Sequence, residues 1–246
     1  MDCLFKLENV SYSFNETSIL KSLSVDIGCE KITGIIGPSG SGKSTFLKLL
    51  NALISPSKGK IFFKGQELVE YKPRLLRKKV AYIQQQPYLF PGTVWDNISY
   101  GPKIWKMEFF EDDAIRILKD LDLKEDILSQ DVETLSGGQK QRISLARYMA
   151  IEPDVFLMDE PSSSLDIAAE ETMENTILKT QKERGVKIIL VSHSMIQTKR
   201  LTDEVIFLVD GQIGEISDTK LFFSTHDEEK LKSMFKKTTE KSEDLK

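Results

Sequence analysis

One glycine-rich segment constrains this chain of 246 residues more than any other feature; it reads Gly37-Pro38-Ser39-Gly40-Ser41-Gly42-Lys43-Ser44-Thr45. The segment fits G-x-x-x-x-G-K-[ST], the pattern of a phosphate-binding loop. The apolar run before it, residues 32–36, predicts a buried strand, and residues 46–50 after it predict a helix. A loop in that position points backbone N–H groups and the positive end of a helix dipole at one place. The sequence therefore predicts a site for phosphate groups.

Within this loop, each type of residue has its own expected role. Glycines let the backbone curl around a phosphate where a Cβ atom would block it. We expect Lys43 to bridge the outer phosphates and the Ser44 hydroxyl to ligate Mg²⁺. A plain Gly/Ser turn beside a lysine is the alternative, and the flanking strand and helix argue against it.

Two further segments carry candidate chemistry. Residues 154–160 form an apolar run that ends in the carboxylates Asp159 and Glu160. A carboxylate at a buried strand end can hold Mg²⁺, which favours few carboxylates together with phosphate oxygens. The second segment, Leu135-Ser136-Gly137-Gly138-Gln139, directly precedes an amphipathic helical run over residues 140–150.

Composition excludes several classes of function. The net charge of −4 gives no basic footprint for nucleic acid. Cys3 and Cys29 provide neither a disulfide framework nor a metal-binding spacing. No apolar run approaches the ~20 residues that span a bilayer, so any membrane-spanning part must belong to another chain.

In this order, the motifs resemble those of the nucleotide-binding subunit of ATP-binding cassette (ABC) transporters, over about residues 4–223. The resemblance implies ATP and Mg²⁺ as cofactors and ATP hydrolysis that drives transport. It implies a homodimer of cassettes bound to integral membrane permease subunits, with a substrate-binding protein if the complex is an importer. The expected location is cytoplasmic, peripheral on the inner face of the cell membrane.

Alternating strands and helices predict an α/β fold with a parallel sheet. As in the family, we expect a P-loop NTPase core, an N-terminal antiparallel β subdomain and a helical subdomain inserted at about residues 86–151. Residues 1–226 are expected to form a single ABC ATPase domain. Residues 227–246 are expected to be a charged, flexible tail, because they carry too few apolar side chains to order themselves.

The resemblance also implies roles for residues outside the loop. Glu160 would polarise the attacking water, His193 would contact the γ-phosphate, and Gln85 would sense Mg²⁺ and water. Gln84 remains the alternative to Gln85, one residue away. Phe14 would stack on adenine, with Tyr12 as the runner-up.

Ser136, Gly137, Gly138 and Gln139 would bind the γ-phosphate held by the other subunit, so that two cassettes enclose two ATP molecules. The alternative is an ordinary glycine-rich helix start with Ser136 as its cap. Residues 163–166 resemble a loop at the dimer interface. The aromatic residues between Pro87 and Pro102 would form either a groove for the membrane partner or part of the core.

A soluble ABC ATPase in a non-transport assembly is the competing function, while the 135–139 segment argues against a small-molecule kinase. The direction of transport stays open, as does the choice between a phosphate-like oxyanion, a metal and another substrate.

Overall fold

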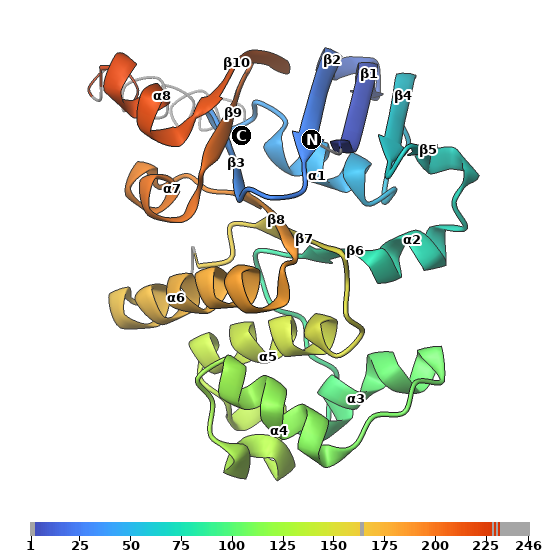
Figure 1. Ribbon diagram of the computed structural model, residues 1–246, viewed down its shortest axis with the longest axis vertical. Helices are drawn as coiled ribbons and strands as arrows, with labels where there is room; N and C mark the ends of the chain where they lie inside the picture. The colour runs from blue at the N-terminus through green and yellow to red at the C-terminus, as the bar shows by residue number, and fades with distance from the viewer. Residues whose placement is uncertain (1–2, 163–164, 228, 230, 232–246) are drawn as a thin grey trace.

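The computed structural model describes residues 3–162, 165–227, 229 and 231. Figure 1 shows the elements stacked in layers, with a small sheet at the top of the view, a larger sheet running through the middle and several helices below it. Ser163 and Ser164 of the predicted dimer loop, and most of the predicted tail, lie outside the described residues.

The larger sheet has six strands in the order β10-β9-β3-β8-β7-β6. All neighbouring pairs from β9 to β6 are parallel, and β10 adds an antiparallel edge. The strands are β3 (Thr33–Ile36), β6 (Val80–Ile83), β7 (Val155–Asp159), β8 (Lys187–Val191), β9 (Glu204–Val209) and β10 (Gln212–Asp218).

Each face of this sheet packs against a different layer. Side chains alternate along a strand, so in β7 Leu157 joins the core shared with α1 (Lys43–Leu50) and the small sheet. Its neighbours Phe156 and Met158 join the core formed with the helices on the other face. The sheet thus separates two hydrophobic cores, which explains why the strands β6, β7 and β8 are buried along their whole length and almost continuously apolar.

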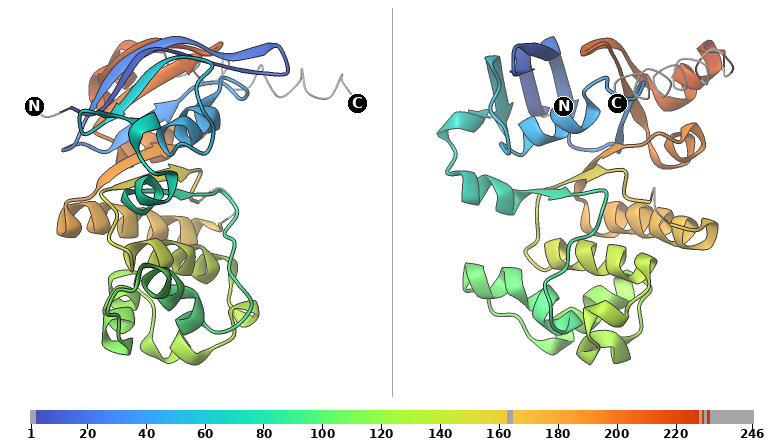
Figure 2. Two further views of the ribbon diagram at one scale, coloured as in Figure 1. Left: turned by 90° about the vertical axis from the view of Figure 1, so that its right-hand side faces the viewer. Right: turned by 180° about the vertical axis from the view of Figure 1, so that it is seen from behind.

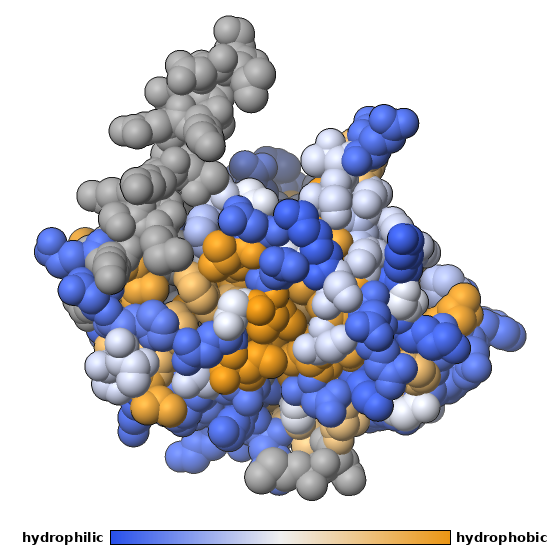
Figure 3. Space-filling model, turned by 90° about the horizontal axis from the view of Figure 1, so that it is seen from above, coloured by the Kyte–Doolittle hydropathy of each residue, from blue (hydrophilic) through white to orange (hydrophobic). Residues whose placement is uncertain are grey.

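The smaller sheet is antiparallel, with the order β2-β1-β4-β5. Its strands are β1 (Cys3–Phe14), β2 (Thr17–Gly28), β4 (Lys58–Phe63) and β5 (Gln66–Glu67). Figure 3 views the molecule from this end, where apolar side chains gather at the centre of the face and hydrophilic ones surround them.

The helices below the large sheet come mostly from the chain between β6 and β7 (Figure 2). They are α3 (Val94–Trp105), α4 (Glu111–Asp120) and α5 (Gly137–Met149), with α6 (Ile167–Arg184) between them and the sheet. The remaining helices are α2 (Pro73–Lys79), α7 (Met195–Leu201) and α8 (Thr219–Thr225), with 3₁₀ turns at Leu68–Glu70, Glu125–Ser129 and Val132–Thr134. The predicted fold class, with its antiparallel β part and inserted helices, is confirmed.

Helix α3 was not expected from the sequence. It starts at a capping box in which Thr93 and Asp96 bond each other's backbone N–H groups. It then continues through Pro102, which is buried. Gly101 and Pro102 are typical of a turn, but here the glycine allows close packing, because a Cβ on Gly101 would lie 2.5 Å from Ile151.

Candidate active site

The predicted site residues follow four neighbouring strands of the large sheet. The strands lie in the order β3-β8-β7-β6, and Gly37, His193, Glu160 and Gln85 follow them in that same order. The carboxyl ends of parallel strands share one edge of the sheet, which is where ligands bind in open α/β sheets. The topology therefore gathers residues from distant parts of the sequence at one place.

The backbone of the phosphate loop requires glycine at two positions. Gly37 has a φ of 149°, and a Cβ there would lie 1.9 Å from the carbonyl oxygen of Leu208. Gly42 has a φ of 99° and caps the first turn of α1. Within the described chain, the Ser41 hydroxyl is buried without a hydrogen-bond partner. The loop thus holds an unsatisfied polar group, as a ligand-binding loop would.

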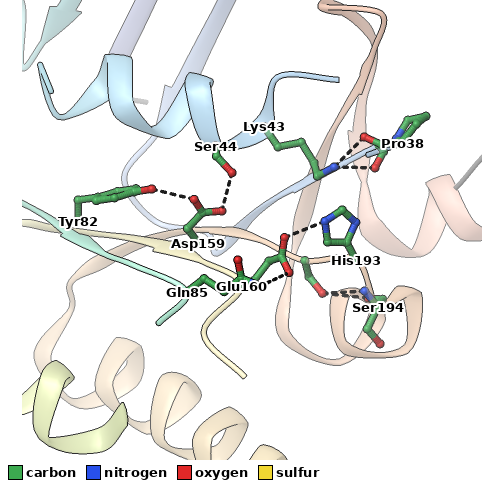
Figure 4. A network of polar contacts seen from close by, with 11 residues as sticks. Pro38, Lys43, Ser44, Tyr82, Gln85, Asp159, Glu160, His193 and Ser194 are labelled. Atoms are coloured by element: carbon green, nitrogen blue, oxygen red, sulfur yellow. Dashed lines mark hydrogen bonds and ion pairs between the residues drawn. The ribbon is translucent and has the colours of Figure 1, made fainter. Parts of the chain in front are cut away.

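Lys43 lies at the centre of this loop. Its Nζ donates hydrogen bonds to the carbonyl oxygens of Gly37 and Pro38, both at 2.8 Å (Figure 4). Burial lowers the pKa of Lys43 to about 8, although the charges of Glu160 and Asp159 act in the opposite direction. Of the other loop residues, Ser39 and Gly40 are exposed and Thr45 is half-buried.

Asp159 lies at the end of β7 and joins two elements. Its Oδ1 accepts a hydrogen bond from the Ser44 hydroxyl at 2.9 Å, and its Oδ2 accepts one from the Tyr82 hydroxyl at 2.7 Å. Burial and the neighbouring carboxylate raise the pKa of Tyr82, so its phenol keeps its proton and acts as the donor. One buried carboxylate beside one hydroxyl is a donor set that fits Mg²⁺ bound to a nucleotide.

Glu160 meets residues from both neighbouring strands. One carboxylate oxygen lies 2.7 Å from Nε2 of His193, and the other accepts a hydrogen bond from Nε2 of Gln85 at 3.2 Å. Its φ of 50° is rare for a residue other than glycine. Such strained residues concentrate at functional sites. The structure thus brings Gln85, Glu160 and His193 together, as Figure 4 shows.

Phe14 and Tyr12 differ in their surroundings. Phe14 ends β1 and is 59% exposed, whereas Tyr12 packs partly buried against the core. Phe14 therefore offers the more accessible ring surface.

The 136–139 segment begins α5. The Ser136 hydroxyl accepts a hydrogen bond from the backbone N–H of Gln139 at 3.3 Å, and the Gln139 side chain accepts one from that of Ser136 at 2.9 Å. A Cβ on Gly138 would lie 3.1 Å from Ala169, so helix packing explains this glycine. A Cβ on Gly137 would meet nothing within 4 Å in the described part of the chain. Packing within the subunit therefore gives no reason for Gly137.

The phosphate loop and the 136–139 segment do not share a layer. Helix α1 packs on one face of the large sheet, and α5 belongs to the helical layer on the other face (Figure 1). One chain therefore presents these two segments from opposite sides of the sheet.

Two polar contacts were missed by the sequence reasoning. Tyr82 is the first, and its signal was a phenol in an otherwise apolar buried strand. The second is Gln197, whose amide donates to Ser162 at 2.5 Å and to Glu174 at 3.3 Å. No local pattern pointed to Gln197, because its partners lie on other elements.

Comparison with known proteins adds independent evidence. Residues 20–163 match the model of the family described as ABC transporter. Among the curated relatives, "ABC transporter I family member 17" of Arabidopsis thaliana is 41% identical to this chain. The aligned region covers 85% of this chain and 80% of the relative. The phosphate import ATP-binding protein PstB of Mycoplasma mobile is 40% identical, covering 89% and 83% respectively.

Solved structures agree with these relatives. CbiO1 of Clostridium perfringens, described as part of the transporter complex cbiONQ, superposes with a TM-score of 0.83 at 27% identity over 91% of this chain and 92% of its own. The cassette MJ0796, solved as a dimer bound to ADP and Pi, superposes with a TM-score of 0.76 at 29% identity. This superposition covers 87% of this chain and 98% of the MJ0796 chain. Within the described residues, no helix has the length and apolarity to cross a bilayer. The chain belongs to the ATP-binding cassettes of the ABC transporter family and is an ATPase.

Proposed function

We propose that this ATPase powers transport through separate integral membrane subunits, working as a dimer of cassettes on the cytoplasmic side of the membrane. The observation that carries the hydrolytic part is the position of Glu160, held between His193 and Gln85 beside the phosphate loop. Phosphoryl transfer needs positioning and charge stabilisation more than covalent chemistry, and this cluster provides both.

Each residue then has a defined task. The loop N–H groups and Lys43 bind the phosphates, and Phe14 stacks on the base. Glu160 orients a water molecule for attack, while His193 fixes the carboxylate and reaches toward the terminal phosphate. Ser44 and Asp159 would hold Mg²⁺, which supplies positive charge to the phosphate oxygens when bound.

The placement of the 136–139 segment supports the proposed dimer. A helix N-terminus is an anion-binding site, but α5 lies across the sheet from its own phosphate loop. We propose that this segment contacts the γ-phosphate held by a second copy of the chain. The open space beside Gly137 supports this arrangement, because a phosphate could approach its backbone there.

An exposed aromatic cluster supports the membrane partner. Tyr88 is 66% exposed, and Phe90 packs against both Tyr88 and Tyr100. The Arg147 guanidinium lies over the Phe90 ring, 4.4 Å from its centroid, and donates to the Tyr88 carbonyl oxygen. Trp95 instead packs on the core. We propose that Tyr88, Phe90 and Tyr100 dock a cytoplasmic segment of the permease.

The shared site is tested with two variants. Lys43→Ala disables the phosphate loop but leaves the 136–139 segment usable. Ser136→Arg leaves the loop intact and places a bulky side chain at the start of α5. Each homodimer should lack ATPase activity, whereas mixed heterodimers contain one intact site and should regain activity in proportion to their fraction.

The control is a mixture of wild-type chain with the Lys43→Ala/Ser136→Arg double variant. If the heterodimer isolated from that mixture by a different tag on each chain hydrolyses ATP and the complementing heterodimer does not, the shared site is wrong. The membrane partner is tested by purifying tagged chain in mild detergent. A permease should co-purify with the wild-type chain but not with the Tyr88→Ala/Tyr100→Ala variant. If no permease co-purifies with the wild-type chain, that result contradicts the transport proposal.

A further inference from the structure

Tyr82 reaches the active site from a strand that is otherwise apolar. In β6 it lies directly opposite Leu157 of β7, and both side chains join the core that contains α1. Asp159 is two residues beyond Leu157 and so faces the same side of the sheet. This register brings the Tyr82 hydroxyl within 2.7 Å of Oδ2 of Asp159, as Figure 4 shows.

The two oxygens of Asp159 point to different elements. Oδ1 faces the Ser44 hydroxyl at the start of α1, and Oδ2 faces Tyr82 on β6. The terminal torsion of an aspartate is broad and has no sharp preferred value. The carboxylate plane is therefore set by its partners, and the hydrogen bond from Tyr82 fixes the oxygen that does not face Ser44.

We propose that Tyr82 is a positioning residue for the metal–nucleotide complex, which it serves by holding the Asp159 carboxylate with Oδ1 toward Ser44. The inference rests on the proposed role of Ser44 and Asp159 in holding Mg²⁺. Residues that hydrogen-bond a metal ligand orient it and tune its basicity, and their loss commonly costs about 10–100-fold in metal affinity.

A purely structural role for Tyr82 predicts something different. Tyr82 is only 7% exposed, so its ring contributes to the core and its hydroxyl needs a partner. If that were all, removing the hydroxyl would change the stability of the protein without changing how nucleotide binding depends on metal. The metal dependence therefore separates the two roles.

The test is Tyr82→Phe, which removes one oxygen atom and keeps the ring. We expect the Mg²⁺ concentration that half-saturates the enhancement of ATP binding to rise about tenfold or more. The Kd of ATP measured in EDTA should change less than about twofold, because Tyr82 does not itself contact the nucleotide in this proposal. Both quantities come from fluorescence titration of nucleotide, with thermal unfolding of the nucleotide-free protein measured alongside.

Tyr71→Phe is the matched control. The Tyr71 hydroxyl donates to the carbonyl oxygen of Phe63 in β4 at 3.0 Å, so it bonds to the backbone of the small sheet and not to Asp159. This variant should keep the wild-type Mg²⁺ requirement. If Tyr82→Phe does not fold, Tyr82→Met provides a second hydroxyl-free side chain that adapts to the core and should show the same shift.

The outcomes distinguish this inference from the proposed function on which it rests. Suppose that Tyr82→Phe needs the same Mg²⁺ concentration as wild type, while Asp159→Asn no longer responds to Mg²⁺ in the wild-type range. Tyr82 then does not position the carboxylate, and the proposed metal site is supported. If Asp159→Asn and Ser44→Ala also keep the wild-type requirement, the proposed metal site itself is wrong.

Discussion

The side chain of Lys43 should take up a proton as ATP binds, because part of it is the neutral amine in the free protein near pH 8. Burial in the loop lowers its pKa in the free protein to about 8. Phosphate oxygens stabilise the charged form, so the pKa should rise toward or above its usual range in the complex. Between these two pKa values, nucleotide binding must be accompanied by protonation of Lys43.

The size of the effect follows from that pKa. Below pH 7 the lysine is already charged and binding draws almost no proton. At pH 8 about half a proton should be taken up per ATP, and at pH 9 about nine-tenths. The Kd should therefore rise about tenfold between pH 7 and pH 9, which corresponds to about 1.4 kcal/mol.

Isothermal titration calorimetry in buffers of different ionisation enthalpy measures this uptake directly. Measurements at pH 8 and 9 avoid the titration of the nucleotide, since phosphate monoesters lose their last proton near pH 6. Lys43→Arg is the control, because a guanidinium stays charged throughout this range and should show no uptake.

Lys187 provides a second control. Burial also lowers the pKa of this lysine to about 8. Lys187 is the first residue of β8, however, so it lies at the amino-terminal ends of the parallel strands, whereas the phosphate loop follows the carboxyl end of β3. Lys187→Met should leave the uptake unchanged. An unchanged Kd from pH 7 to 9, or an uptake that persists in Lys43→Arg, would refute the reasoning.

The other substitutions probe individual parts of the site. Glu160→Gln should retain ATP binding, abolish turnover and give an ATP-stabilised dimer in gel filtration; hydrolysis near the wild-type rate would remove Glu160 from its role. Phe14→Ala should weaken ATP binding by about 1–3 kcal/mol, the range for base stacking on an aromatic ring, and by more than Tyr12→Ala in fluorescence titrations. Gly37→Ala should lower thermal stability and ATP binding, because its Cβ would meet a backbone carbonyl of β9, whereas Gly28→Ala, with open space around it, should show neither loss.

The features that the sequence predicted are local or follow from strand order. The phosphate loop is one contiguous segment, so its pattern is visible without any knowledge of tertiary contacts. Gln85, Glu160 and His193 each follow an apolar run, and parallel strands bring their carboxyl ends to one edge. Their convergence could therefore be expected once a parallel sheet was predicted.

The contacts that were missed depend on register. Tyr82 meets Asp159 across 77 positions of sequence only because it pairs with Leu157 rather than with a neighbouring residue. A shift of one residue would turn the phenol to the opposite face of the sheet. The contact of Gln197 with Ser162 similarly depends on how α7 packs beside the loop after β7. Neither strand register nor helix packing can be predicted from the local hydrophobic periodicity of the sequence.

The proposed docking surface and the proposed hydrolytic residues are joined by short paths. Gln85 contacts Glu160 and lies three residues before Tyr88. A displacement of the aromatic cluster would therefore reach the Glu160 carboxylate through a short stretch of backbone and one hydrogen bond. Arg147 connects the same cluster to α5, a rod of 13 residues and about 20 Å. The 136–139 segment is the other end of that rod. A permease segment that moves the cluster would therefore act on the chain's own Glu160 and on the γ-phosphate site proposed for the partner subunit.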